Sequence, residues 1–167
     1  MKRATLCCAV LALFFAAFPL TAQTQAWTSV GSAGTIDRAS LGLYATSTAA
    51  LGFQPAPTGG VVARYNVTNA FGGGFTDTPP WNIFEMTYFD NSPSSVVSAT
   101  LFEVDRCTGA VTVVCGMNSF DAAGNTCTRC TFATGAINFA TSHYVVEVKV
   151  SRSLNTVNPQ LIALRIF

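Results

Sequence analysis

Hydrophobic and polar residues alternate with a period of two over several stretches of this chain, a pattern typical of half-buried β-strands. The region from Trp81 to Cys115 contains three such runs, joined by two turn-like breaks. In its first run Phe84, Met86 and Tyr88 share one face, opposite a polar face. The region therefore predicts a three-stranded meander with one apolar face, which a second sheet must cover.

The second and third runs of this meander predict a hairpin. If Thr108 and Gly109 are the central residues of a tight turn, then counting along the strands places Val104 opposite Val113 and Phe102 opposite Cys115. In this register the apolar side chains of both strands point to the same side of the sheet.

Other strands are expected at 61–68, 131–139, 143–151 and 161–167. Their expected inward residues are Val61, Ala63, Tyr65 and Val67, then Tyr144, Val146, Val148 and Val150, and finally Ile162, Leu164 and Ile166. Seven or eight strands without a helical period predict an all-β fold, an antiparallel β-sandwich. A jelly-roll-like arrangement is the first choice and an immunoglobulin-like one the second, because two cysteines do not bracket a tryptophan with the immunoglobulin spacing.

The first 26 residues have the features of a cleavable signal peptide, with a basic start at Lys2 and Arg3 and an uncharged apolar run. We expect residues 27–58 to form an N-terminal arm with one weak strand near Leu41–Ala45, and 59–167 to form the core of a single domain. The expected location is secreted, extracellular or at the cell surface, with the periplasm as an alternative. No membrane span is expected after cleavage.

The composition narrows the range of partners. Without Lys2 and Arg3 the 9 basic residues become 7, against 8 acidic ones, and no basic cluster remains. This balance argues against nucleic acid as a partner. Only 10% of the residues are charged, against about 25% in typical domains. Surfaces so poor in charge tend to associate, which favours a homo-oligomer or another surface protein as the partner.

Four cysteines follow the signal segment: Cys107, Cys115, Cys127 and Cys130. In an exported chain this number indicates two disulfides. The predicted hairpin separates Cys107 from Cys115 by about 17 Å, too far for a bridge. We therefore expect Cys107 and Cys115 each to pair with one of Cys127 and Cys130, and the sequence leaves open which.

Candidate catalytic residues are few. Glu85, Glu103 and Glu147 are each expected in the middle of a strand on its outer face, where two of them on neighbouring strands could form a glycosidase-like pair. Three aromatic residues could then stack on sugar rings: Trp81, Tyr88 and Tyr144. Cross-strand ion pairs are the simpler explanation for the carboxylates. His143 is the only histidine, and neither a metal site nor a cofactor is predicted.

Two functional hypotheses follow. The preferred one is a secreted, disulfide-stabilised, non-catalytic β-sandwich that acts as a structural or interaction protein and self-assembles by strand addition through residues 41–45. The alternative is a carbohydrate-binding or carbohydrate-cleaving module, with a glycan as partner.

Overall fold

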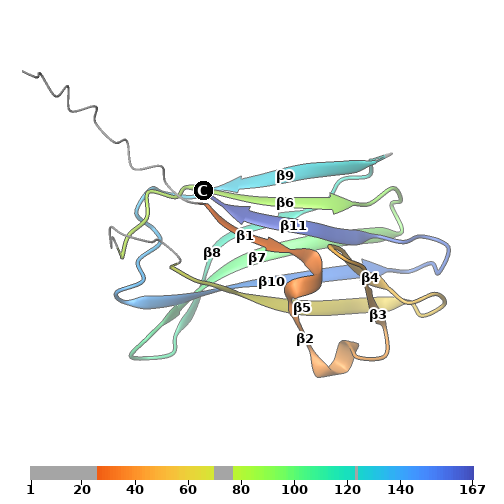
Figure 1. Cartoon of the computed structure of the whole chain (residues 1–167), viewed down its shortest axis with the longest axis horizontal. Coiled ribbons are helices and arrows are strands. Elements are labelled where there is room, and N and C mark those ends of the chain that lie inside the picture. The colour runs from red at the N-terminus through yellow and green to blue at the C-terminus, as the bar shows by residue number, and fades with distance from the viewer. Residues whose placement is uncertain (1–25, 70–76, 123) are drawn as a thin grey trace, which may run out of the picture.

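The computed structural model describes residues 26–69, 77–122 and 124–167. Within them the chain forms two antiparallel sheets that pack face to face, with β4–β11 wound as a jelly roll (Figure 1). The predicted β-sandwich is confirmed. The signal-peptide prediction falls outside the described residues, except for Ala26.

The first sheet, sheet A, has the order β3-β4-β11-β6-β9, and β1 pairs with β11 beside β4. Its strands are β1 (Trp27–Val30), β3 (Tyr44–Thr46), β4 (Leu51–Phe53), β6 (Ile83–Phe89), β9 (Asn125–Thr131) and β11 (Gln160–Ile166).

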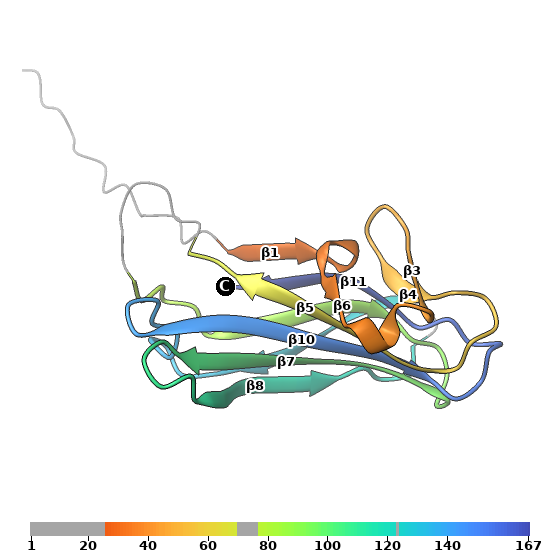
Figure 2. The same cartoon turned by 90° about the horizontal axis from the view of Figure 1, so that it is seen from below.

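The second sheet, sheet B, has the order β2-β5-β10-β7-β8, and four of its strands run side by side in Figure 2. Its strands are β2 (Thr35–Ile36), β5 (Gly59–Val67), β7 (Ser95–Asp105), β8 (Val111–Asn118) and β10 (Ser142–Arg152). Two short 3-10 turns, η1 (Gly31–Ala33) and η2 (Arg38–Ser40), complete the N-terminal region.

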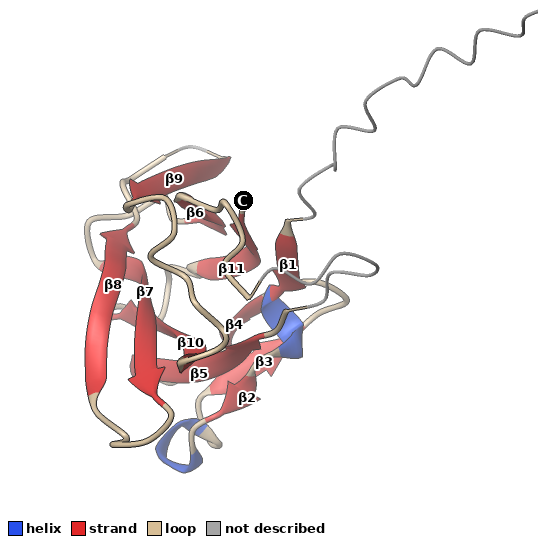
Figure 3. Cartoon of the chain, turned by 90° about the vertical axis from the view of Figure 1, so that its left-hand side faces the viewer, coloured by secondary structure: helices blue, strands red, loops and turns tan. Residues whose placement is uncertain are grey.

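The core lies between the two sheets, and Figure 3 views the molecule along the long axis of Figure 1. The residues that the alternation predicts to point inward are all buried in three strands, β5, β6 and β10. In β7 the prediction is wrong, because Val97, Ala99 and Leu101 point inward whereas Phe102 and Val104 point outward. The reason is the pairing with β10, which sets each of the three buried β7 residues opposite an inward valine of β10.

The β7–β8 hairpin has a longer loop than predicted. Val104 pairs with Val111 rather than Val113, and a bulge brings Cys115 opposite Leu101. The Asp105 carboxylate explains the loop, because its Oδ1 accepts hydrogen bonds from the backbone N–H groups of residues 107 and 108 and from the threonine hydroxyl. These bonds also lower the pKa of Asp105, with the one from the residue 108 N–H the largest cause.

Two other strand predictions are corrected. The strand expected at 131–139 lies earlier, as β9, and 132–141 is a loop in which Ile137 is completely buried. A bulge in β11 turns Leu161 inward in place of Ile162, which is half-buried. The N-terminal arm contains four short strands instead of one. Of the segment 41–45 expected to pair with a neighbour, Tyr44 and Ala45 lie in β3 and pair with β4 of the same chain.

One disulfide, Cys115–Cys130, joins the edge strands β8 and β9 of the two sheets, with a Cα–Cα distance of 6.0 Å. It belongs to one of the two expected pairings. The second expected bridge is not formed, since Cys107 and Cys127 are exposed free thiols. Residues three apart in a strand point to opposite faces, so when Cys130 turns toward β8, Cys127 turns away from it.

Candidate functional site

The three candidate glutamates do not form a catalytic pair. Glu85 lies on the outer face of sheet A, and Glu147 lies on the outer face of sheet B. Glu103, expected on an outer face, instead pairs across the sheet with buried Tyr144 and accepts a hydrogen bond from the Ser142 hydroxyl at 2.6 Å. The carboxyls therefore occupy three separate environments, which is incompatible with the two-carboxylate geometry of a glycosidase using these residues.

Glu147 belongs to a surface ion-pair network. Arg64 bridges it, at 2.8 Å from Nη2 to Oε2, to the Asp37 carboxylate, at 3.0 Å from Nη1 to Oδ2. The Ala39 N–H and then the guanidinium lower the pKa of Asp37. The two carboxylates raise the pKa of Arg64. Both are exposed ion pairs, and the Arg64–Glu147 pair joins the neighbouring strands β5 and β10.

The expected sugar-stacking residues are inside the molecule. Trp81 and Tyr88 are completely buried, and Tyr144 is 2% exposed. The Tyr144 hydroxyl accepts a hydrogen bond from the Asn138 N–H at 2.7 Å, and burial raises its pKa. Phe139 meets the Tyr144 ring edge-on at 5.2 Å. Phe139 also meets the Trp81 ring edge-on, at 6.2 Å. Because all three expected residues are buried, none of them is available to a ligand on the surface.

The outer face of sheet B carries an apolar cluster at the β8 edge. Val111 and Val113 are 60% and 62% exposed, and they pair with Val104 and Phe102 of β7. Val145 of β10 continues the row beyond Phe102. We call these five residues the β8 patch. His143, on the same face opposite Val104, lies at its rim and is exposed.

The β8 edge also has free backbone groups. The Asp105 N–H donates to the Ala110 carbonyl, and hydrogen-bonded and non-bonded pairs alternate along an antiparallel ladder. The backbone groups of Val111 and Val113 therefore point away from β7, toward the open edge. β8 contains no charged residue and no proline, the usual protection of an edge strand.

The outer face of sheet A has a groove of about 380 Å³ between β1 and β6, over β11. Thr28, Arg165, Glu85 and Arg129 form one row across β1, β11, β6 and the neighbouring strand β9. The Glu85 Oε2 accepts a hydrogen bond from the Arg129 Nε at 2.6 Å. The Arg165 guanidinium lies 4.2 Å from the centre of the Phe167 ring. Arg165 and Phe167 were not among the sequence candidates, because nothing in the alternation shows which outward residues become neighbours.

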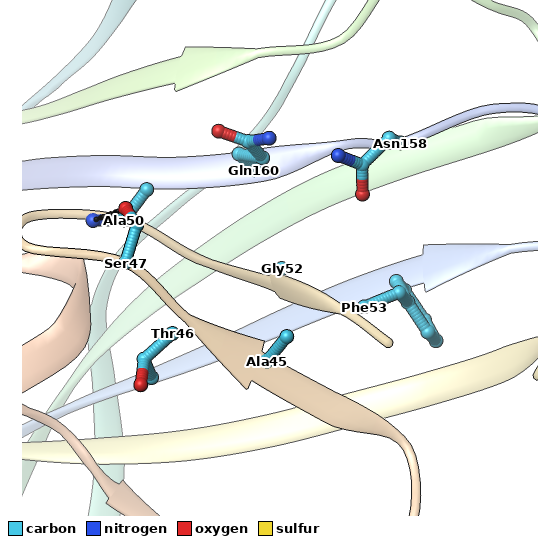
Figure 4. Close-up of a pocket in the computed structure, with 8 residues that line it drawn as sticks. All are labelled: Ala45, Thr46, Ser47, Ala50, Gly52, Phe53, Asn158 and Gln160. Carbon is cyan, nitrogen blue, oxygen red and sulfur yellow. Dashed lines mark hydrogen bonds between the residues drawn. The ribbon is translucent and has the colours of Figure 1, made fainter. Parts of the chain in front are cut away.

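A smaller hollow, of about 150 Å³, lies between the β3–β4 hairpin and the start of β11 (Figure 4). The Asn158 and Gln160 side chains border it on one side, and the hairpin borders it on the other, where the Ala50 N–H donates to the Ser47 hydroxyl. The residues that line it include no acid, base or thiol. It therefore offers amide and hydroxyl groups for binding but no group suited to acid–base catalysis.

Within residues 26–69, 77–122 and 124–167, no three His, Cys, Asp or Glu side chains are grouped so as to hold a metal ion. No helix in this described part of the chain has the length and apolar character needed to span a membrane.

Several solved β-sandwiches resemble this chain in overall structure. One is a carbohydrate-binding module of family CBM36 in complex with calcium and xylotriose (12% identity, 84% of this chain and 99% of that chain, TM-score 0.46). Another is a xylan-binding domain of family CBM22 (12% identity, 83% of this chain and 85% of that chain, TM-score 0.42). A third is a family 35 carbohydrate-binding module from Clostridium thermocellum (10% identity, 86% of this chain and 98% of that chain, TM-score 0.40). No protein-family model and no curated protein matches the chain. Identity at this level transfers no binding residue to this protein.

Proposed function

We propose that this chain is an exported, non-catalytic interaction domain that acts at or outside the cell surface and associates with a second copy of itself. The association joins the open edge of β8 to the same edge of the other copy. The observation that carries the proposal is this edge: an uncharged strand whose two exposed valines and outward backbone groups have no strand beyond them in sheet B.

A second copy fits this edge better than an unrelated strand does. Antiparallel pairing of β8 with itself satisfies the same N–H and C=O groups on both chains, so the interface is self-complementary. Because the strand carries no charge, self-pairing brings no like charges together. The β8 patches of both copies then form one apolar row across a sheet continuous through the two molecules.

Light scattering of the purified protein over a range of concentrations tests the proposal. We expect a concentration-dependent dimer, and a monomer for the double variant Val111→Lys/Val113→Lys, because each copy would then place two ammonium groups beside those of its partner. The matched control is Val96→Lys/Leu154→Lys, which adds the same charge at residues 40% and 51% exposed. The control should still dimerise. A wild-type protein that stays monomeric at the highest concentration reached would refute the proposal.

Hydrogen exchange provides a residue-level test. The Val111 and Val113 amides should exchange fast in dilute solution and slowly in concentrated solution, because their N–H groups gain partners only in the dimer. The Thr112 amide should be protected at both concentrations, since Thr112 faces Glu103 in the ladder. Protection confined to other strands would show that the copies meet elsewhere.

Export is tested separately from association. If residues 1–26 are a signal peptide, N-terminal sequencing of the protein recovered outside the cytoplasm begins at Trp27, or at Gln23 if cleavage follows Ala22. A cytoplasmic protein that begins at Met1 would remove export from the proposal and leave the β8 interface untouched.

A further inference from the structure

We propose that the groove on the outer face of sheet A binds an acidic sugar, with Arg165 as the residue that takes the carboxylate of the ligand. This site lies on the opposite sheet from the β8 edge and is independent of it. Its parts are a guanidinium, a partly engaged carboxylate and two threonine hydroxyls, all on strands of one sheet.

The charges around the groove leave Arg165 available. Glu85 is its cross-strand neighbour, but the Glu85 carboxylate is bound by Arg129 from the other side. Among the residues that the structure describes, no carboxylate lies within ion-pair distance of Arg165. The row of side chains across these strands therefore holds two guanidiniums and one carboxylate, which is bound by Arg129, and it carries one net positive charge. A carboxylate ligand would complete the row.

The geometry of Arg165 suits a planar anion. Its guanidinium stacks on the Phe167 ring, which Arg129 also approaches at 5.9 Å. Stacking restricts the side chain before a ligand arrives, so less conformational freedom is lost on binding. The exposed edge of the fork can then donate two parallel hydrogen bonds to a carboxylate.

The remaining groups indicate a polyol rather than a peptide. β11 is paired with β1 on one side and with β6 on the other, so its backbone groups beneath the groove are used in the sheet. An extended peptide lying over β11 in the groove therefore finds no free backbone groups on that strand to pair with. What remains is side chains: the Thr28 hydroxyl, the Thr87 hydroxyl, which also contacts the Cys127 Sγ at 3.3 Å, and Glu85, whose Oε1 takes part in no hydrogen bond among the described residues. Hydroxyls and a carboxylate oxygen match the hydroxyl groups of a sugar ring.

The volume of the groove is consistent with this class of ligand. About 380 Å³ is near the lower end of the range for small-molecule sites. The open trough suits one or two units of an oligosaccharide, and Ala163, which pairs with both Val30 and Thr87, gives it a floor without a bulky side chain.

Calorimetric titration with short uronate oligomers, of galacturonate, mannuronate or glucuronate, tests the inference. We expect the wild-type protein to bind at least one of them. The methyl ester of that oligomer should bind at least ten-fold more weakly, because it keeps every hydroxyl and loses the charge. Binding should also weaken as salt is added. An aspartate oligomer of equal charge should not compete.

Variants locate the site. Arg165→Gln should lower the affinity at least ten-fold, and Arg165→Lys should restore only part of it, because an ammonium keeps the charge but not the fork. Lys149→Gln, which removes an exposed cation from the outer face of sheet B, should bind like the wild type. The circular dichroism spectra and melting temperatures of all variants are compared, so that a folding defect is recognised. Four results would each overturn the inference. They are no measurable binding of any uronate oligomer, equal binding of the methyl ester, competition by the aspartate oligomer, and full affinity in Arg165→Gln.

Discussion

Removing the Cys115–Cys130 disulfide should measurably weaken the domain. The bond between Cys115 and Cys130 closes a loop with a sequence separation of 15. On the chain-entropy model, a loop of this size contributes about 3 kcal/mol to the free energy of unfolding. Cys130→Ala removes the bond and leaves the buried Cys115 side chain in place. For a domain of this size, about 3 kcal/mol corresponds to a fall in melting temperature of roughly 10 °C.

The matched control is Cys127→Ala, which removes an exposed free thiol three residues away on the same strand. In urea unfolding, the wild type and Cys127→Ala should have the same midpoint, and Cys130→Ala should have a clearly lower one. Adding a reductant should bring the wild type down to the Cys130→Ala value. A thiol titration of the unfolded protein, after removal of residues 1–26, should find two free thiols. Equal urea midpoints for Cys130→Ala and Cys127→Ala would refute the reasoning, and so would a count of four free thiols or of none.

Three other changes test the interior. Asp90→Ala should lower the free energy of unfolding by about 3 kcal/mol in urea melts, because the buried carboxylate accepts hydrogen bonds from the Ser95 and Ser119 hydroxyls, each at 2.5 Å. Gly31→Ala should cost about 2 kcal/mol or more in the same assay, because a Cβ there would clash with a carbonyl of β11. Burial raises the pKa of Tyr65, whose hydroxyl donates to the Gly31 carbonyl. The folded state therefore keeps this proton at a pH where the unfolded state releases it. The free energy of unfolding should fall above about pH 10, by up to about 1.4 kcal/mol per pH unit. Tyr65→Phe should reduce this slope in urea melts from pH 8 to 11.

The sequence predicts the sandwich well where a strand is apolar on one face only. In β6 and β10 every second residue is strongly apolar, and only one assignment of faces buries them. β7 is different, because it has large apolar side chains on both faces: Val97 and Leu101 on one, and Phe102 on the other. Alternation alone cannot choose between these faces. The choice is made by the partner strand, which is a long-range effect.

The strand β9 was placed too late in the chain for a related reason. Its residues are polar or small on both faces, so the segment has no amphipathic signal of its own. It is a strand because β6 offers a complete ladder from Ile83 to Phe89 and because Cys130 is bonded to β8. The groove depends on the same kind of information. Arg165 and Glu85 are 80 positions apart, and only the pairing of β11 with β6 makes them neighbours.

The disulfide also limits how far the proposed association can extend. At Cys115 it holds β9 beside β8, so the free edge of β8 is confined to the few residues near the hairpin, from Val111 to Val114. Four residues provide a short ladder and a small apolar contact, which favours a weak dimer over a permanent one. Pairing of identical edges about a two-fold axis uses up both edges, and the assembly then closes at two copies instead of growing into a fibre. The same covalent bond that stabilises the sandwich therefore keeps its self-association limited.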